Sequence, residues 1–416
     1  MRYLIAVCLI AGCYKPSTES CYYGCATQGQ PCPSGLECVA GNMCATPGET
    51  CDMTGGDGGI DSSTDAPGTA CGDGIATMGE VCFGTPITIN APGNPSFGQL
   101  ADRDGDGSLD LIYLDQSNYR FHLNNAGVLS TTASAGPPTF DATTMLTANL
   151  NGNAGVELIH TNPFQVDGFT ALANMQHTQL FSYPLSQFAP ARAMAFGKIT
   201  GSPIGALAIS HEFQLVIYRF DSPQTITQRD VVPIDSAVDV AVGLLNTDAF
   251  EDVILATTNG VVVFLASSLN LGSPSQWGPL TTVDDVEVGD FDNDNRRDIA
   301  FISVATGTLG ILKGRPDDTF EPAITQQITD LGSPLAVADL NRDGRSDVIA
   351  IQLGLSPSVL IARGKSDGSL DTPIKIPLNA RASHLSVRGD FNGDQVPDIV
   401  VTDNAGRKLV VIPSNP

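Results

Sequence analysis

Acidic side chains recur at every second residue in the stretch DRDGDGSLD, which runs from Asp102 to Asp110. Asp102, Asp104 and Asp106 take positions one, three and five of this stretch. Gly107 follows at position six, where glycine readily adopts the positive φ of a sharp turn, and Asp110 stands at position nine. Calcium takes about six to eight hard oxygen ligands, so the spacing predicts a loop that wraps its side chains around one Ca²⁺ ion.

The same pattern occurs three more times in the chain. DFDNDNRRD begins at Asp290, DLNRDGRSD at Asp339 and DFNGDQVPD at Asp390. The last two copies carry asparagine at position three, which still offers an amide oxygen. The predicted calcium ligands are positions one, three, five and nine of the four loops: Asp102, Asp104, Asp106, Asp110, Asp290, Asp292, Asp294, Asp298, Asp339, Asn341, Asp343, Asp347, Asp390, Asn392, Asp394 and Asp398.

Two other interpretations of these loops are open. An EF-hand closes its ligand shell with a glutamate at position twelve. Here that position is Tyr113, Phe301, Ala350 or Val401, inside apolar runs typical of strands, so the loops are not EF-hands. The other interpretation is that loops rich in Asp and Asn only favour turns and bind nothing. Clustered carboxylates repel one another without a cation, which favours calcium. We expect this calcium to be structural, because no loop adjoins a catalytic constellation.

The copies differ in quality. Position six is Asn295 in the second good loop and Gln395 in the fourth, and glutamine tolerates a positive φ less well than asparagine does. Three degenerate copies begin at Asn149, Lys198 and Leu244. The copy at Leu244 keeps three ligands and is predicted to be weak or empty, and the other two lack the charge to bind a bare dication.

The seven copies begin at intervals of 46 to 51 residues, which indicates a repeat architecture. Apolar runs such as DLIYLD, DVILAT and DIVVTD follow the loops, and other short runs precede them or come later. Four short strands per copy are typical of a propeller blade. We therefore predict an all-β fold over residues 86–416, a seven-bladed β-propeller of four-stranded blades.

The two ends of this region complement each other. The last copy ends after its third run, in KLVVIPSNP, and therefore lacks a fourth strand. The segment TPITINAP precedes the first copy and has no blade of its own. We predict that residues 86–91 complete the seventh blade, which would leave no exposed sheet edge.

Three stretches of the chain resemble a known family. SFGQLADRDGDGSLDLIYLD, VADLNRDGRSDVIAI and VRGDFNGDQVPDIVV are similar to FG-GAP/VCBS repeats. The resemblance spans residues 86–416 and implies an integrin-α-like propeller whose loops bind calcium. By the same resemblance, a partner would dock on the broad face formed by the blade loops, away from the calcium rim.

The N-terminus begins MRYLIAVCLIAGC, a basic start followed by a short apolar run. Residues 1–12 are predicted to be a signal peptide, and the run is too short to span a bilayer. Its last residues resemble a bacterial lipobox, which implies lipid on Cys13 and, with Tyr14 following, an outer-membrane location. An ordinary secretory signal is the alternative.

Cysteines fall almost entirely in the first part of the chain. Eight of the ten follow Cys13 and precede residue 83, and an even number in an exported chain implies disulfides. Six of them lie in a predicted disulfide-rich module over residues 13–52, which resembles cysteine-rich segments of bacterial surface proteins: Cys21, Cys25, Cys32, Cys38, Cys44 and Cys51. The later segment CGDGIATMGEVC resembles cysteine repeats of myxobacterial surface proteins. Residues 53–70 are predicted to be a flexible linker, and Cys71 and Cys82 to close a loop over residues 71–85. A zinc site is the alternative, but no histidine precedes residue 122.

Composition narrows the function classes. The chain has 45 acidic and 21 basic residues and a net charge of −24, which argues against nucleic acid. The motif GKSDG at Gly364 aligns with a turn, the five histidines occur singly, and the RGD at Arg388 shares Asp390 with a predicted calcium loop. We expect an exported, monomeric, non-enzymatic surface binding or adhesion module for an extracellular protein or polysaccharide. The alternatives are a carbohydrate-binding propeller and, third, a propeller lyase or hydrolase.

Overall fold

The structure of the chain, a computed structural model, describes residues 23–24, 37–39, 43–45 and 81–415, except 116–117, 126, 140, 171–176, 186–189 and 269. The chain forms two compact units, Met1–Ala66 and Pro67–Pro416. In the first unit, β1 (Tyr23–Gly24), β3 (Met43–Ala45) and β2 (Glu37–Val39) form a small sheet in that order. The predicted signal peptide, Cys13, the linker and the disulfides of the cysteine-rich module lie outside the described residues.

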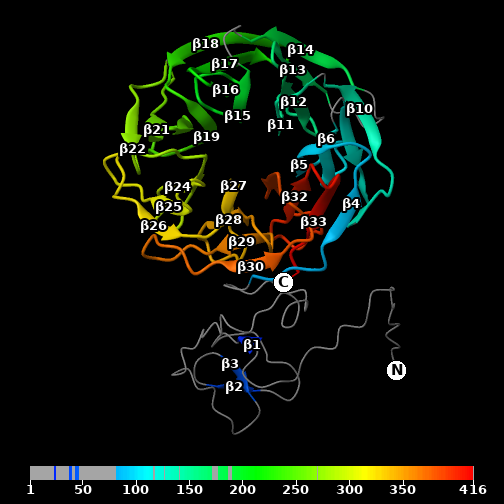
Figure 1. Ribbon diagram of the computed structural model, residues 1–416, viewed down its shortest axis with the longest axis vertical. Helices are drawn as coiled ribbons and strands as arrows, with labels where there is room; N and C mark the ends of the chain where they lie inside the picture. Colours follow the sequence, from blue (N-terminus) through cyan, green and yellow to red (C-terminus); the bar gives the residue numbers. More distant parts are fainter. Residues whose placement is uncertain are drawn as a thin grey trace, which may run out of the picture. The chain divides into compact units, whose positions relative to one another are not determined.

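The second unit contains seven four-stranded antiparallel sheets arranged around a centre, like the blades of a propeller (Figure 1). Blade 1 contains β5 (Pro95–Ala101), β6 (Asp110–Asp115), β7 (Asn118–His122) and β10 (Ser134–Pro138), with a small hairpin of β8 (Asn124–Asn125) and β9 (Val128–Leu129). Blade 2 contains β11 (Thr144–Ala148), β12 (Glu157–Thr161), β13 (Gln165–Phe169) and β14 (Gln179–Pro184). Blade 3 contains β15 (Ala191–Gly197), β16 (Gly205–His211), β17 (Gln214–Ser222) and β18 (Thr225–Pro233).

The remaining blades follow the same order along the chain. Blade 4 contains β19 (Ala237–Gly243), β20 (Asp252–Thr257), β21 (Gly260–Phe264) and β22 (Ser275–Trp277). Blade 5 contains β23 (Asp285–Gly289), β24 (Asp298–Ser303), β25 (Thr308–Leu312) and β26 (Ile324–Gln327). Blade 6 contains β27 (Leu331–Ala338), β28 (Asp347–Gln352), β29 (Ser358–Ala362) and β30 (Ile374–Pro377). Blade 7 contains β31 (His384–Ser386), β32 (Ile399–Asp403), β33 (Lys408–Ile412) and β4 (Ile87–Asn90). The predicted all-β propeller of seven four-stranded blades is confirmed.

The hydrophobic core lies between the blades. Each of the seven apolar clusters contains side chains from two neighbouring blades. Because both faces of a blade are covered, the middle strands are apolar along their whole length instead of alternating. β6, β20 and β24 are buried at every residue. The innermost strands contact one another in the cyclic order β5, β11, β15, β19, β23, β27, β31 and again β5.

The ring closes as the sequence predicts. β4 pairs with β33 as the outer strand of blade 7, with Ile89 opposite Leu409 and Ile87 opposite Val411. A further bridge joins Phe83 to Ser414. This pairing leaves blade 7 as complete as its neighbours, although its strands come from both ends of the propeller sequence. Cys82, which lies close to this point of ring closure, is disulfide-bonded. The predicted partner, Cys71, lies outside the described residues.

Strand direction divides the loops between two faces of the propeller. Strands alternate in direction within each antiparallel blade. The loops from first to second strand and from third to fourth strand therefore lie on one face, here called the carboxylate face. The loops from second to third strand and the connections between blades lie on the other, here called the hairpin face. All four predicted calcium loops join first to second strands, so they share the carboxylate face.

Candidate metal centres

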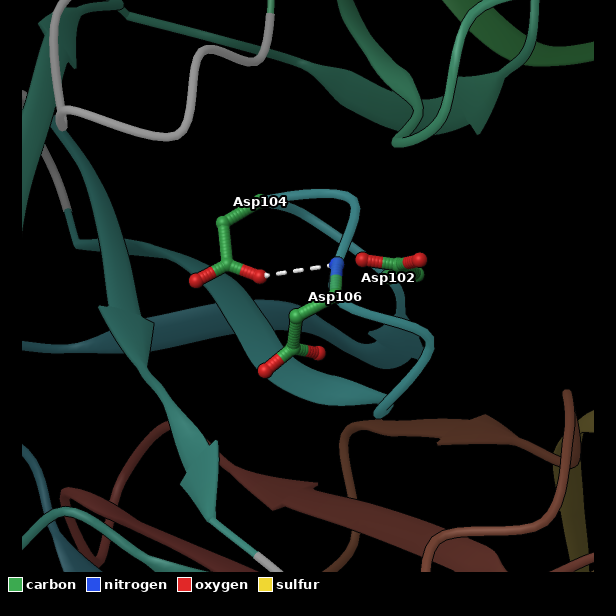
Figure 2. Close-up of side chains that lie close together, drawn as sticks. All are labelled: Asp102, Asp104 and Asp106. Carbon is green, nitrogen blue, oxygen red and sulfur yellow. Dashed lines mark hydrogen bonds between the residues drawn. The ribbon is translucent and has the colours of Figure 1, made fainter.

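The loop at Asp102 brings its acidic side chains together (Figure 2). One carboxylate oxygen each from Asp102, Asp104 and Asp106 lies within 4.8 Å of the others. The backbone amides fix this arrangement, because Asp102 accepts hydrogen bonds from Gly105 (2.7 Å) and Gly107 (3.0 Å). Asp104 accepts one from the Asp106 amide at 3.3 Å. The loop thus folds around three converging carboxylates.

The other three loops repeat this hydrogen-bond pattern. The side chain at position one accepts a hydrogen bond from the backbone amide at position six. The side chain at position three accepts from the amide at position five, and the side chain at position five accepts from the amide at position seven. Position six has a positive φ in all four loops, namely Gly107 (89°), Asn295 (65°), Gly344 (82°) and Gln395 (69°). Gln395 therefore adopts the turn that its side chain disfavours. Position four is also left-handed in every loop, which the sequence analysis did not predict.

A second triad lies in the loop at Asp290. One oxygen each from Asp290, Asp292 and Asp294 lies within 4.8 Å of the others. This loop already holds cations of the chain itself: the Lys313 ammonium contacts Asp292, and Arg296 lies 3.3 Å from Asp294. In the loop at Asp339, Arg345 contacts Asp343 in the same way. Among the residues that the structure describes, no such ion pair forms at the triad of the loop at Asp102.

The acidic residues at position nine do something different from the triads. Each is buried, and both of its oxygens accept backbone amides, one from position two of the loop and one from the second residue after the third strand. We call these the anchor carboxylates. Asp110 accepts from Arg103 (3.1 Å) and Asn124 (2.8 Å), Asp298 from Phe291 (3.0 Å) and Gly314 (2.8 Å), Asp347 from Leu340 (3.0 Å) and Gly364 (3.1 Å), and Asp398 from Phe391 and Ser414 (2.6 Å). Their part in closing a calcium shell stays a prediction.

Burial makes the anchor carboxylates costly to ionise. Loss of hydration raises the pKa of Asp298 and of Asp347 to about 7, although the backbone amides that donate to each carboxylate lower that pKa in part. The same cause raises the pKa of Asp110 and of Asp398 to about 6. A cation near the triads would offset this cost, because it favours the charged form of every carboxylate around it.

One degenerate loop keeps the anchor without the triad. Asp252 accepts from Leu245 at 2.9 Å and from Ala266 at 2.8 Å. In the copy at Asn149, Glu157 accepts the Leu150 amide at 2.8 Å. Position nine therefore has a structural use that does not depend on a metal triad.

The donor set in the two triads fits calcium. Carboxylate and amide oxygens on a flexible loop are the ligands that calcium prefers, and no sulfur or imidazole accompanies them. Positions one, three and five would hold the ion, whose double positive charge would compensate the converging carboxylates. The ion's identity and the occupancy of the four loops stay predictions.

A group of carboxyls that the sequence analysis missed lies on the innermost strands of blades 4 and 5. Asp239 lies on β19, and Asp285 and Glu287 lie on β23. Asp239 accepts the Val286 amide at 3.3 Å, and Ser333 donates to Asp285 at 3.3 Å. Burial raises the pKa of Asp239 to about 6 and that of Glu287 to about 7. Burial, then the negative charges of its two neighbours, raises the pKa of Asp285 well above its usual range.

These pKa shifts predict an effect of pH on stability. Glu287 is protonated in the folded state up to about pH 7, whereas an unfolded glutamate ionises near pH 4.5. Its ionisation therefore costs nothing below pH 4.5, and the resulting destabilisation of the fold grows between pH 4.5 and about 7 and stays constant above that. We expect Glu287→Gln to stabilise the protein by about 1–2 kcal/mol at pH 8, after allowance for solvent screening of this half-buried group.

Urea unfolding in EDTA at pH 4.5 and pH 8 checks this prediction. Little change is expected at the lower pH, because both side chains are then neutral. Arg388, Asp239 and Asp285 are the other charged or titratable groups that act on Glu287 or its neighbours. A Glu287→Gln effect of equal size at both pH values would contradict the assignment.

The hairpin face carries apolar side chains at the tips of its loops. Phe164, Phe213 and Leu355 lie between second and third strands, and Leu280 lies in the connection from blade 4 to blade 5. They expose 79%, 59%, 105% and 78% of their surface, respectively. On the carboxylate face the exposed large apolar side chains among the described residues are Val128 and Leu244. Exposed apolar groups of this size favour a contact with another molecule.

The motifs that imitate catalytic signatures have structural roles here. GKSDG forms the turn between β29 and β30, where Gly364 bridges to Leu370. His122, His160 and His211 are buried within strands. The part of the chain that the structure describes has no helix long and apolar enough to cross a membrane.

Comparison with known proteins supports the repeat assignment. Residues 290–350 and 339–401 match the profile of the FG-GAP-like repeat. These two overlapping stretches contain the loops of blades 5, 6 and 7, so this part of the chain consists of FG-GAP-like repeats. No curated protein matches the chain.

Solved structures share the propeller fold at low sequence identity. The crystal structure of BBS1N in complex with ARL6DN, soaked with mercury, has 11% identity and a TM-score of 0.57 and covers 80% of this chain and 98% of its own. An Agrocybe aegerita lectin that recognises non-reducing terminal N-acetylglucosamine has 14% identity and a TM-score of 0.51, covering 70% and 81%. At such identities the likeness concerns the fold alone.

Proposed function

We propose that this chain is an extracellular binding module, stabilised by calcium and without enzymatic activity, that holds another protein on its hairpin face. The exposed apolar tips of that face are the observation that carries the proposal. The fold fits such a role, because FG-GAP-like repeats form a rigid scaffold on which loops can vary. The candidate calcium loops lie on the opposite face, where they would stiffen the blades without meeting the partner.

Asymmetry between blades supports a protein partner. The four most exposed apolar tips of the hairpin face come from blades 2, 3 and 6 and from one connection, so they do not repeat around the ring. A protein surface meets one asymmetric patch, whereas binding of a repeated sugar is served by a repeated pocket. Protein interfaces also rely on a few large apolar anchors in their centre.

Site-specific cross-linking on intact cells tests the proposal. A photoreactive phenylalanine analogue is placed in the full chain at Phe164 or Phe213, and in a control at Val128, which is 69% exposed on the carboxylate face. We expect a discrete protein adduct from the two hairpin-face positions and none from position 128. Phe164→Ser and Phe213→Ser should each weaken capture of that protein by about tenfold, since each buries a large apolar anchor. Adducts formed only from Val128 would overturn the proposal.

A lectin is the second candidate function, and the likeness to the N-acetylglucosamine-binding lectin favours it. A glycan array probed with the full chain in calcium and in EDTA separates the two candidates. Calcium-dependent binding to a defined sugar class would support the lectin. A blank array from folded protein would leave the protein-binding module as the better explanation.

The proposed location follows from the sequence. We propose export and lipid anchoring at Cys13 on a bacterial outer membrane. The segments that carry both signals lie outside the described residues. A lipid label that wild type incorporates and Cys13→Ser does not would support the anchor. Equal labelling of the two would exclude it.

A further inference from the structure

A cavity with a partly apolar lining lies at the seam where blade 7 meets blade 1. It has a volume of about 380 Å³ and is lined by Ser96, Phe97, Arg381, Ser383, His384, Asn404 and Ala405. These residues come from the start of β5, the approach to β31 and the loop from β32 to β33. β5 and β32 lie side by side at the seam (Figure 1). By strand direction the cavity belongs to the hairpin face.

The walls of the cavity are held in place from both blades. The Asn404 side-chain amide donates to the Pro95 carbonyl oxygen across the seam at 3.1 Å, and the Asn404 backbone amide donates to the Ser383 hydroxyl oxygen at 3.2 Å. The Phe97 ring meets the His384 ring edge-on, with centroids 5.1 Å apart. Phe97 has φ 52°, a left-handed backbone that non-glycine residues rarely adopt. Strained backbone of this kind is frequent at binding sites.

Arg381 gives the cavity its charge. Its backbone amide donates to Asp403 at 3.0 Å, but its guanidinium forms no ion pair with any residue that the structure describes. The Asp403 carboxylate is already compensated, because it also accepts the Gly406 amide at 2.7 Å and lies 3.9 Å from the Lys408 ammonium. An unpaired guanidinium in a chain of net charge −24 is open to an external anion.

The neighbouring histidine adds neutral hydrogen-bonding capacity. Burial, and then the positive charge of Arg388, lower the pKa of His384 to about 4, so its ring is uncharged near pH 7. No hydrogen bond to its ring nitrogens is formed by the described residues. Together with Ser96, it offers donors and acceptors that suit the peptide groups beside an acidic side chain.

The cavity differs from its counterpart between blades 5 and 6. That cavity, of about 570 Å³, is lined by Val304, Gln327, Asp330 and Leu331, among others, and contains no basic or aromatic residue. The combination of Arg381, His384 and Phe97 is therefore not repeated at this second seam. A basic pocket that this second seam lacks suits one protein partner better than a repeated sugar.

We propose that this cavity, here called the seam pocket, binds the carboxylate of an aspartate or glutamate side chain from the protein partner. Arg381 would pair with the carboxylate, while His384 and Asn404 would hydrogen-bond the flanking peptide groups. The inference rests on the proposed function and adds to it the chemistry that fixes the partner's register. Charged contacts at an interface contribute specificity and association rate in this way.

A peptide array tests the seam pocket directly. The full chain is applied to decapeptides that carry one central Asp or Glu among apolar residues, and to matched peptides with Asn or Gln. We expect the best acidic peptides to bind at least about tenfold more tightly than their amide counterparts, a ratio typical of a lost charged hydrogen bond. Arg381→Gln should abolish this ratio.

Arg192→Gln is the matched control. It removes the same charge near the hairpin face, but Arg192 is already paired with Glu212 at 3.5 Å, so the ratio should persist. Equal binding of acidic and amide peptides by wild type, or an unchanged ratio in Arg381→Gln, would overturn the proposal. So would binding of oligogalacturonate in place of every peptide. Cross-linking at Phe164 that survives Arg381→Gln, with no acidic preference on the array, would reject the seam pocket and leave the proposed function standing.

Discussion

Replacing Asp347 by alanine should destabilise the propeller by about 3–5 kcal/mol, because two buried backbone amides would then lose their acceptor. Asp347 is fully buried, and its two oxygens accept from Leu340 and Gly364 at 3.0 and 3.1 Å. Those amides lie at the start of the loop and just after β29. The anchor therefore joins the loop that carries the triad to the turn beside it, and its loss loosens both.

Urea unfolding of the full chain at pH 7 in EDTA measures this effect without calcium. Asp367→Ala is the control from the same blade: its exposed carboxylate accepts the Ser369 amide at 3.0 Å, and its removal should change the free energy of unfolding little. The destabilisation caused by Asp347→Asn should fall between these two values. The asparagine side chain keeps one acceptor oxygen but turns its NH₂ group, a donor, toward the second backbone amide. If Asp347→Ala lowers the free energy of unfolding in calcium but not in EDTA, Asp347 acts mainly as a calcium ligand and the anchor assignment is wrong.

The anchor explains a feature of the sequence that calcium alone does not. Asp252 and Glu157 keep an acid at position nine in loops whose triads are degenerate. In both, the side chain accepts the amide at position two. An acid at position nine is therefore compatible with a loop that binds no ion. The spacing alone could not separate these two roles, because one aspartate satisfies both patterns.

Much of the fold could be predicted from the sequence because each blade repeats its neighbour. The interval between loops, the apolar run after each loop and the unmatched strand at residues 86–91 were enough to predict seven blades and their closure. The paired strands β4 and β33 confirm the closure. Local patterns were sufficient here because, within a blade, each strand pairs with one that lies close to it in the sequence, except where β4 pairs with β33.

The parts that depend on the closed ring could not be predicted in the same way. Asp239 and Asp285 come from different blades and meet only when the innermost strands are brought together. The seam pocket joins Phe97 to His384, which lie at opposite ends of the propeller sequence. Nothing in the local pattern around either residue indicates the other. A weak signal existed in β23, where acids interrupt the apolar run DVEVG.

Calcium should raise the melting temperature of the full chain by several degrees relative to EDTA. Two sites filled at 2 mM calcium, with dissociation constants of about 0.1–1 mM as in extracellular modules, would together add about 1–4 kcal/mol. The same weak affinity would leave the sites empty inside a cell and fill them outside it, so that final folding would be coupled to export. Equal melting temperatures in EDTA and in millimolar calcium would exclude the calcium proposal.

Single-site variants separate the contributions of the two triads. Asp104→Asn and Asp292→Asn should each remove part of the calcium-dependent rise, whereas Asp367→Asn, at an exposed turn on the same face, should leave it unchanged. The two triads should not respond equally. At the triad of the loop at Asp102 the positive charge of Arg103 acts on Asp104, whereas in the other triad the Lys313 ammonium contacts Asp292 directly. A calcium ion that binds this triad would therefore compete with an internal cation at Asp292.

Lys313→Met follows from this competition. Without the ammonium, the Asp292 loop should be less stable in EDTA, because its carboxylates then repel one another with less compensation. Its calcium affinity should rise by about tenfold, since the ion no longer competes with an attached positive charge; one like charge at close range has an effect of this order. Calorimetric titration of Lys313→Met beside wild type measures both affinities. An affinity that falls, or that stays the same, would show that Lys313 supports the loop and does not compete with the ion, and the triad at Asp290 would then bind calcium with the ammonium in place.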